Sequence, residues 1–172
     1  GFADGDTILN MMEAKGYRQE LDIYTGTLTT EYDLHGPTNI TAFAHQTIPN
    51  LFVMKIDRKP ISPEKELVLR IFCETSPSQN ANIKWKAPPV GVSISAGDGR
   101  ANITSKTNMT TTNWSVIAEG NEVRQEGDQV IIRLTQEESL IRFHVQRDDV
   151  ADEGALTQSF EELMASHTTP WE

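Results

Sequence analysis

Cysteine is almost absent from this chain of 172 residues, which contains only Cys73. A single thiol cannot form an intramolecular disulfide bond, and it cannot supply the several thiolates of a structural zinc site. Cys73 ends an apolar run and alternates in phase with Leu69 and Ile71. We therefore expect a buried structural cysteine rather than a nucleophile.

Positive charge is also scarce, because 15 lysine and arginine residues stand against 25 aspartate and glutamate residues, a formal net charge of −10. Phosphate recognition needs clustered basic side chains. The chain has no such cluster, so we predict no nucleic-acid partner. Its acidic residues form short pairs such as Glu137 and Glu138, without the spacing of an EF-hand loop, and we interpret them as solvated surface.

Long apolar runs and histidine clusters are missing as well. No apolar run approaches the roughly 20 residues of a membrane-spanning helix, so we predict no membrane partner. His35, His45, His144 and His167 never lie within four residues of one another or of the cysteine, so there is no local metal-ligand spacing. No nucleophile lies beside a general base in a recognisable motif. We predict no metal ion, no cofactor and no catalytic residue.

Alternation of polar and apolar residues is the main pattern that the chain does have. From residue 27 onward, Leu28, Thr30 and Tyr32 would point to one face of a strand and the intervening residues to the other. This period of two predicts a mainly β protein with antiparallel sheets. We expect strands near residues 17–23, 27–35, 38–47, 51–57, 66–74, 82–86, 90–95, 114–119, 129–135 and 139–146.

A common alternation phase also predicts which side chains fill the space between two facing sheets. The predicted core consists of Leu28, Tyr32, Leu69, Ile71, Ile132, Leu134, Ile141 and Phe143. In the last strand, the residues between the core positions, Arg142, His144 and Gln146, are expected to face solvent.

Two helices are expected at the ends of the chain. Asp6 could cap a short helix over residues 7–15 that Gly16 would end. From about Gly154 the period changes from two to 3.6, and one apolar stripe forms at Leu156, Phe160, Leu163 and Met164. We expect this C-terminal stripe to pack on the sandwich or on a neighbouring chain.

Three stretches carry a resemblance to a known family. Residues 20–29 match a hairpin in which leucine-aspartate is followed by threonine-glycine-x-leucine-threonine. Residues 43–56 match the next strand, a short turn and a return strand, and residues 155–171 match a linker helix with a histidine and a tryptophan near its end. In these stretches the chain resembles the N-terminal β-sandwich, or super-sandwich, that precedes the helical-barrel catalytic domain of glycoside hydrolase family 65 and, more loosely, family 95. Residues 39–43 lack the arginine that these families often carry there.

The resemblance implies a galactose-mutarotase-like super-sandwich over residues 1–153 and a linker helix over residues 154–172 that leads to an absent catalytic barrel. The implied function is a non-catalytic, carbohydrate-associated domain of a glycoside hydrolase or phosphorylase that supports the barrel and its substrate cleft. The catalytic acid of these families lies in the barrel, so none is assigned here. The resemblance also allows a homodimer. For the location of the chain, we expect the periplasm or the cell exterior in preference to the cytoplasm.

Two aromatic residues are candidates for contact with carbohydrate, because a flat aromatic ring suits the apolar face of a pyranose. These are Trp85 and Trp114, each of which could equally be a core or inter-domain aromatic residue. A second hypothesis for the whole chain is a free-standing immunoglobulin-like binding or adhesion module, which shares the many short strands. The terminal amphipathic helix favours the accessory domain over this alternative.

Overall fold

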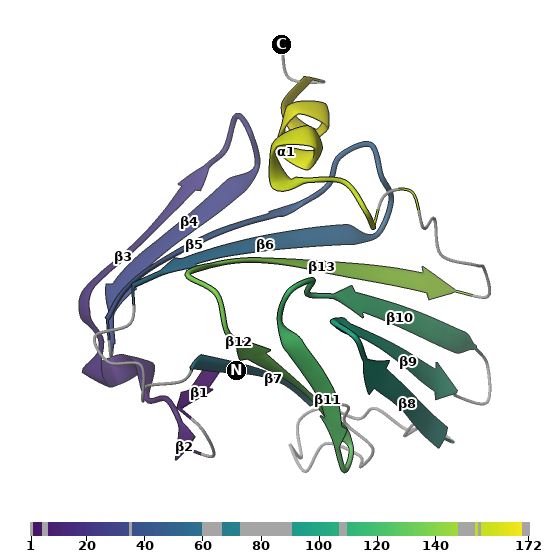
Figure 1. The fold of residues 1–172 in the computed structure, drawn as a ribbon. Helices are drawn as coiled ribbons and strands as arrows, with labels where there is room; N and C mark the ends of the chain where they lie inside the picture. Colours follow the sequence, from purple (N-terminus) through teal and green to yellow (C-terminus); the bar gives the residue numbers. More distant parts are fainter. Residues whose placement is uncertain are drawn as a thin grey trace, which may run out of the picture.

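Two antiparallel β-sheets and one α-helix form the described part of the molecule in a computed structural model (Figure 1). The structure describes residues 2–4, 7–34, 36–59, 67–72, 91–106, 110–147, 154 and 156–169. The predicted mainly β fold with two antiparallel sheets is confirmed. Within the described residues no helix has the length and the apolar character needed to cross a membrane.

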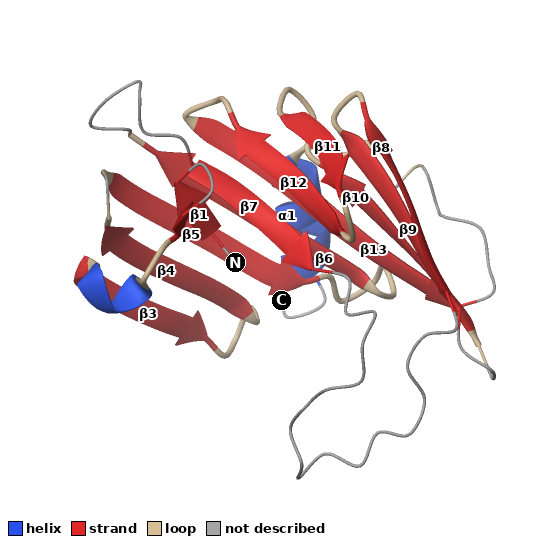
Figure 2. Ribbon diagram, turned by 90° about the horizontal axis from the view of Figure 1, so that it is seen from below, coloured by secondary structure: helices blue, strands red, loops and turns tan. Residues whose placement is uncertain are grey.

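The larger sheet has eight strands. Their spatial order is β3 (Lys15–Asp22), β4 (Thr27–Asp33), β5 (Pro37–Ala44), β6 (Leu51–Arg58), β13 (Glu138–Arg147), β10 (Thr111–Ile117), β9 (Arg100–Lys106) and β8 (Gly91–Gly97). The smaller sheet has five strands. It lies beneath the larger sheet in Figure 1 and in front of it in Figure 2, which is seen from below. Its order is β11 (Glu122–Glu126), β12 (Gln129–Leu134), β7 (Leu67–Phe72), β1 (Phe2–Asp4) and β2 (Thr7–Ile8).

The main core fills the space between the two sheets, where burial of apolar side chains is the dominant stabilising term. Five of the eight predicted core residues are buried in it: Tyr32, Leu69, Ile132, Leu134 and Ile141. Ile71 and Phe143 are partly buried against this cluster. Leu28 is half-buried and is not part of it, because it pairs with the exposed Leu21 of the edge strand β3.

Tight turns account for two strands that the sequence analysis did not predict. Strand β9 pairs with β8 across the two-residue turn Asp98–Gly99, where both residues have positive φ angles of 49° and 73°. These angles are typical of the hairpin turn that favours Asp-Gly. Strand β11 likewise pairs with β12 so that Glu126 lies opposite Gln129. Gly99 and Gly127, both with a positive φ, lie in the turns that join these strands.

The predicted N-terminal helix over residues 7–15 is wrong. Thr7 and Ile8 form strand β2, and only Met11–Glu13 form a short 3-10 helix. Ile8 pairs with Ala3 of β1, so tertiary strand pairing replaces the local helical pattern. Gly16, with a φ of 61°, lies at an irregularity in β3 where the register with β4 shifts, rather than at a helix end. Asp6 lies outside the described residues.

The predicted C-terminal helix is confirmed, although it begins later than expected, as α1 (Phe160–Thr168). Ser159 starts it with a capping box, in which its hydroxyl accepts from the Glu162 N–H and the Glu162 carboxylate accepts from the Ser159 N–H. The helix covers the outer face of the larger sheet (Figure 1).

The apolar stripe of α1 fills a second core on that outer face. Leu163 is fully buried there, with Phe160 and Met164 packed at its sides. The sheet contributes residues from three strands, Phe43, Leu51, Val53 and Ile117. The expected packing of the terminal stripe on the sandwich is therefore confirmed.

We predict that Leu163→Asp lowers the free energy of unfolding by about 2–4 kcal/mol, because it places a charge in this apolar contact. Thermal and urea unfolding of the purified chain measure the effect. Ala165→Asp is the matched control, because Ala165 is exposed on the same helix, and its effect should stay within about 0.5 kcal/mol. Equal effects of the two changes would show that α1 is not docked in solution.

Candidate functional site

Trp114, one of the two predicted carbohydrate-binding residues, lies on the inner face of the larger sheet. It is on β10, opposite Val145 of β13 and Ile103 of β9. Its side chain is 41% exposed, so part of the indole remains accessible. The role of Trp114 in carbohydrate contact stays a prediction. Trp85 lies outside the described residues.

Two phenylalanines lie near Trp114 on the same face. Phe143 is two residues from Val145 on β13, and its ring lies 5.8 Å from that of Phe52, tilted by 49°. Phe52 is 38% exposed. Trp114 therefore belongs to an apolar, partly exposed region at one end of the inner face rather than to the core between the sheets.

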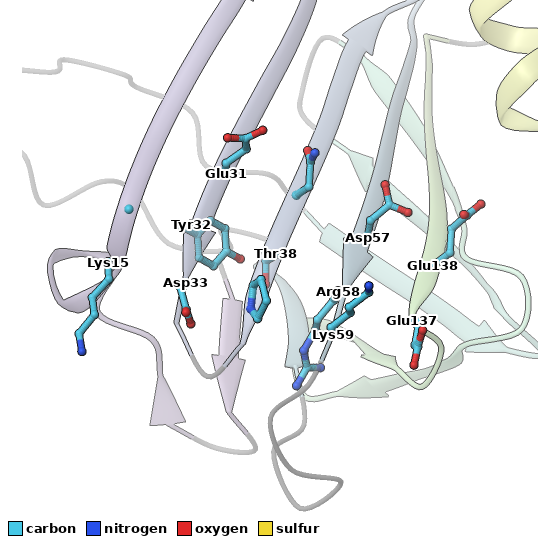
Figure 3. Close-up of a pocket in the computed structure, with 13 residues that line it drawn as sticks. Lys15, Glu31, Tyr32, Asp33, Thr38, Asp57, Arg58, Lys59, Glu137 and Glu138 are labelled. Atoms are coloured by element: carbon cyan, nitrogen blue, oxygen red, sulfur yellow. The ribbon is translucent and has the colours of Figure 1, made fainter.

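A polar pocket of about 630 Å³ lies at the end of the larger sheet that is opposite to Trp114 (Figure 3). At this end β4 and β6 finish and β5 and β13 begin. Its charged lining consists of Glu31, Asp33, Asp57, Glu137, Glu138, Lys15, Arg58 and Lys59. One row of polar residues crosses four neighbouring strands, because Glu31 pairs with Asn39, Asn39 with Asp57 and Asp57 with Glu138. Such a lining suits a small hydroxylated ligand better than an apolar one.

Salt bridges partly neutralise the acidic row of the pocket. The Lys55 ammonium lies 3.1 Å from Glu138 and 3.7 Å from Asp57. Partial burial lowers the pKa of Lys55, but the hydrogen bond to Glu138 and the neighbouring carboxylates raise it overall. Lys55 also lies 5.1 Å from the centre of the Phe160 ring, which places a cation over an aromatic face of α1.

Tyr32 is a buried member of the pocket wall. Only 4% of the residue is exposed, and its hydroxyl has no hydrogen-bond partner among the described residues. Burial raises the pKa of Tyr32. The positive charge of Arg58 lowers it by a smaller amount, so the net shift is upward. The phenol therefore stays protonated at neutral pH and adds a neutral donor to the interior side of the pocket.

Two buried histidines attach α1 to the sheet. The Nδ1 atom of His45 faces the backbone N–H groups of Thr47 and Ile48, at 3.2 and 3.1 Å. Those groups can only donate, so Nδ1 accepts and the proton is on Nε2. Nε2 then donates to the Leu163 carbonyl at 3.1 Å and lies 3.0 Å from the Ser166 hydroxyl.

His167, on the helix itself, repeats this arrangement. Its Nδ1 accepts from the Gln46 N–H at 3.3 Å, and its Nε2 donates to the Thr25 carbonyl at 2.6 Å. The ring stacks on Phe43, with centroids 4.4 Å apart and planes 22° apart. Gly26 lies beside it, and a Cβ there would lie 3.8 Å from His167 Nε2. The helix is thus bonded to the turn between β3 and β4.

Arg142 forms a third attachment, to the segment that precedes α1. Its Nε and Nη2 atoms donate to the Gln158 carbonyl, and Nη1 lies 3.9 Å from the Glu119 carboxylate. Burial lowers the pKa of Arg142, while Glu119 raises it. The expectation that Arg142 and His144 face solvent is wrong: they are 3% and 5% exposed, because they share the outer face that the segment around α1 covers.

The comparisons with known proteins concern the fold. No family model and no curated protein matches this chain. Eleven chains of solved structures match it, and the following is one of them. "Putative kojibiose phosphorylase from human microbiome" superposes on 99% of this chain with a TM-score of 0.64 and 11% sequence identity. The chain spans 26% of the length of that phosphorylase. At this identity the likeness shows a shared fold.

The attachment sites cannot be predicted from the individual elements, because each site joins residues that are far apart in the sequence. His45 and His167 are 122 positions apart in the sequence, and no local spacing relates them. One signal was available: an amphipathic helix expected to pack on a sheet must cover one of its faces, and the polar residues of that face then become buried. Across the residues that the structure describes, no group of three or more potential ligands could hold a metal ion.

We predict that the stability contributed by His45 is lost in acid. Burial is the main cause that lowers the pKa of His45 below its usual 6.5. Above pH 6.5 the folded and unfolded chains are both neutral at this ring, whereas below it the unfolded chain binds a proton first. Stability therefore falls as pH decreases from that value.

The measurement is the melting temperature of the wild-type chain and of His45→Gln as a function of pH. The difference between the two should be largest above neutral pH and should shrink on acidification, because only the wild type loses this contribution. A difference that is independent of pH would contradict the prediction. Long-range nitrogen NMR should also show Nε2 protonation of His45.

Proposed function

We propose that this chain is a non-catalytic accessory domain of a carbohydrate-active enzyme, resembling the N-terminal super-sandwich of glycoside hydrolase family 65 or the related family 95. One observation carries the proposal: almost the whole chain superposes on about a quarter of a protein whose name is that of a glycoside phosphorylase. A fold alone does not imply a function. The hairpin and helix motifs of the sequence point in the same direction, and they are in contact through Thr25 and His167.

In this proposal, α1 is the linker to a catalytic (α/α) barrel that the domain supports. A linker that transmits a fixed geometry must itself be rigid. Leu163, His45, His167 and Arg142 attach α1 and the segment before it at several points of the larger sheet. These attachments support a fixed linker direction rather than a flexible tether. The proposal keeps residues 1–153 as the sandwich and residues 154–172 as the linker.

The immunoglobulin-like alternative is less well supported. Immunoglobulin-like sandwiches have seven to nine strands. The described residues of this chain form thirteen strands, five in one sheet and eight in the other, and a docked helix covers the outer face of the larger sheet. These features favour the accessory-domain proposal.

We predict that the 172-residue chain alone neither hydrolyses nor phosphorolyses glycosides above background. Glycosidic cleavage requires an acid at the leaving oxygen and a second carboxylate or phosphate on the opposite face of the sugar. The assay uses aryl glycosides and α-linked disaccharides, with and without phosphate. A longer protein from the same reading frame, carrying a helical barrel, should be active. Turnover by the chain alone that disappears when one of its own carboxylates is replaced would overturn the proposal.

We also predict weak sugar binding, with a dissociation constant on the order of millimolar, at Trp114 or Trp85. The three tryptophans give three indole N–H signals in NMR, and Trp171 is the internal reference. Titration with α-linked disaccharides should shift the signal of Trp114 or Trp85, and Trp114→Ala or Trp85→Ala should remove it. Shifts confined to amides around Tyr32 and Arg58 would place the sugar in the polar pocket instead.

A further inference from the structure

Exposed apolar side chains concentrate along one edge of the larger sheet. Among the described residues, seven large apolar side chains are substantially exposed. Two of them are Phe52 and Trp114, and the other five lie on β3 or next to its ends: Met12, Tyr17, Leu21, Ile23 and Tyr24, with exposed fractions of 91, 54, 58, 70 and 77%. A concentration of this kind on a soluble surface marks an interaction site.

Strand β3 is also an open edge. It is the first strand of the larger sheet, β4 is its one strand partner among the residues that the structure describes, and all eight of its residues are exposed. An edge strand presents a row of backbone N–H and C=O groups that can pair with another strand. The surface therefore offers both a hydrogen-bonding edge and apolar side chains.

We propose that β3 pairs antiparallel with β3 of a second copy of this chain, about a two-fold axis that passes through Gln19. The two larger sheets then join into one continuous sheet. The proposal does not depend on the accessory-domain function, because it follows from the edge strand and its sequence alone.

Backbone geometry limits where the axis can lie. In an antiparallel pair, only every second residue of a strand directs its N–H and C=O to a given side. Two residues that face each other must either both direct these groups toward the partner strand or both direct them away from it. In a symmetric pair of β3 strands, the two-fold axis must therefore lie between one residue and its own copy, and not between two successive residues of the strand. Four positions in the regular part of β3 remain to be compared: Arg18, Gln19, Glu20 and Leu21.

Charge complementarity selects one of these four positions. An axis at Arg18 would place Arg18 opposite itself. An axis at Glu20 would place Arg18 opposite Asp22 twice, but it would also place Glu20 opposite itself. An axis at Leu21 would place Glu20 opposite Asp22 twice. Only the axis at Gln19 places Arg18 opposite Glu20 of the other copy, twice by symmetry, with no like charges opposed. Opposite charges that face each other across strands are stabilising, and like charges are destabilising.

The same register brings the apolar side chains together. Tyr17 of one copy lies alongside Leu21 of the other, again twice. Because the strands run antiparallel, the turn after β3, with Ile23 and Tyr24, lies beside the 3-10 helix of the second copy, which carries Met12. One symmetric contact then brings exposed apolar side chains of the two copies next to one another.

Charge reversal tests the register. The Arg18 and Glu20 side chains are 67% and 64% exposed and already form an ion pair with each other within one chain. Exposed ion pairs contribute little to stability, so we expect replacement of either residue to leave the fold intact. Sedimentation velocity over a wide concentration range should show a monomer–dimer equilibrium for the wild type. Arg18→Glu and Glu20→Arg should each weaken it by about tenfold or more, and the double variant should restore it. Asp128→Arg changes the net charge as Glu20→Arg does, at an exposed turn, and should have no effect.

Cysteine cross-linking tests the position of the axis, in a Cys73→Ala background. Opposed residues of an antiparallel pair have Cα atoms about 4.5–5.5 Å apart, within disulfide reach. Gln19→Cys should therefore form a disulfide-linked dimer under mild oxidation. Leu21→Cys should not, because the two copies of that position are about 14 Å apart along the strands.

A chain that remains monomeric at every concentration overturns the proposal. So does a dimer that neither charge reversal weakens, or a double variant that fails to dimerise. Efficient cross-linking of Leu21→Cys with none for Gln19→Cys would also overturn it, because the axis would then lie elsewhere.

Discussion

Burial on both faces of strands β5, β6 and β13 is the constraint on which the rest of this structure depends. Alternate residues of these strands point to opposite sides. On the inner side, Ile40, Ile56 and Ile141 pack against the smaller sheet, while on the outer side Phe43 and Val53 pack under α1. Without the helix, the outer apolar residues of a soluble sheet would face water. The smaller sheet and the helix therefore have the same role, because each buries one apolar face of the larger sheet.

The polar residues on the outer face become specific attachments for the same reason. A buried polar group is costly unless it is hydrogen-bonded. His45 bonds the Leu163 carbonyl and Arg142 bonds the Gln158 carbonyl, while His167 reaches back from the helix to Thr25. Apolar packing holds α1 on the sheet, and these bonds fix its position along it. A helix held in this way can set the direction in which a following domain extends, as the proposed accessory function requires.

Much of the sheet structure was predictable from local pattern. The strands at 27–33, 51–58 and 138–147 follow from alternation, and Tyr32 and Ile141 were placed correctly in the core. The predicted secondary structure was wrong or incomplete where the local pattern of residues favoured one element and strand pairing favoured another. Thr7 and Ile8 fit a helix in isolation but pair as a strand with β1. Asp98–Gly99 is the hairpin turn that joins the strand predicted near 90–95 to a strand that was not predicted. In each case a partner distant or unrecognised in the sequence decided the outcome.

The sequence by itself determined the β class, the strand phase and the amphipathic C-terminal helix, because each depends on residues close together in the chain. The tertiary structure alone decided which face of the larger sheet α1 covers, and therefore that Arg142 and His144 are buried rather than solvated. It also decided that Leu21 and Tyr24 lie on an open edge, since strand order is a property of long-range pairing. Period-2 alternation predicts that a strand has two faces. Which element packs against each face depends on the arrangement of the layers in the tertiary structure.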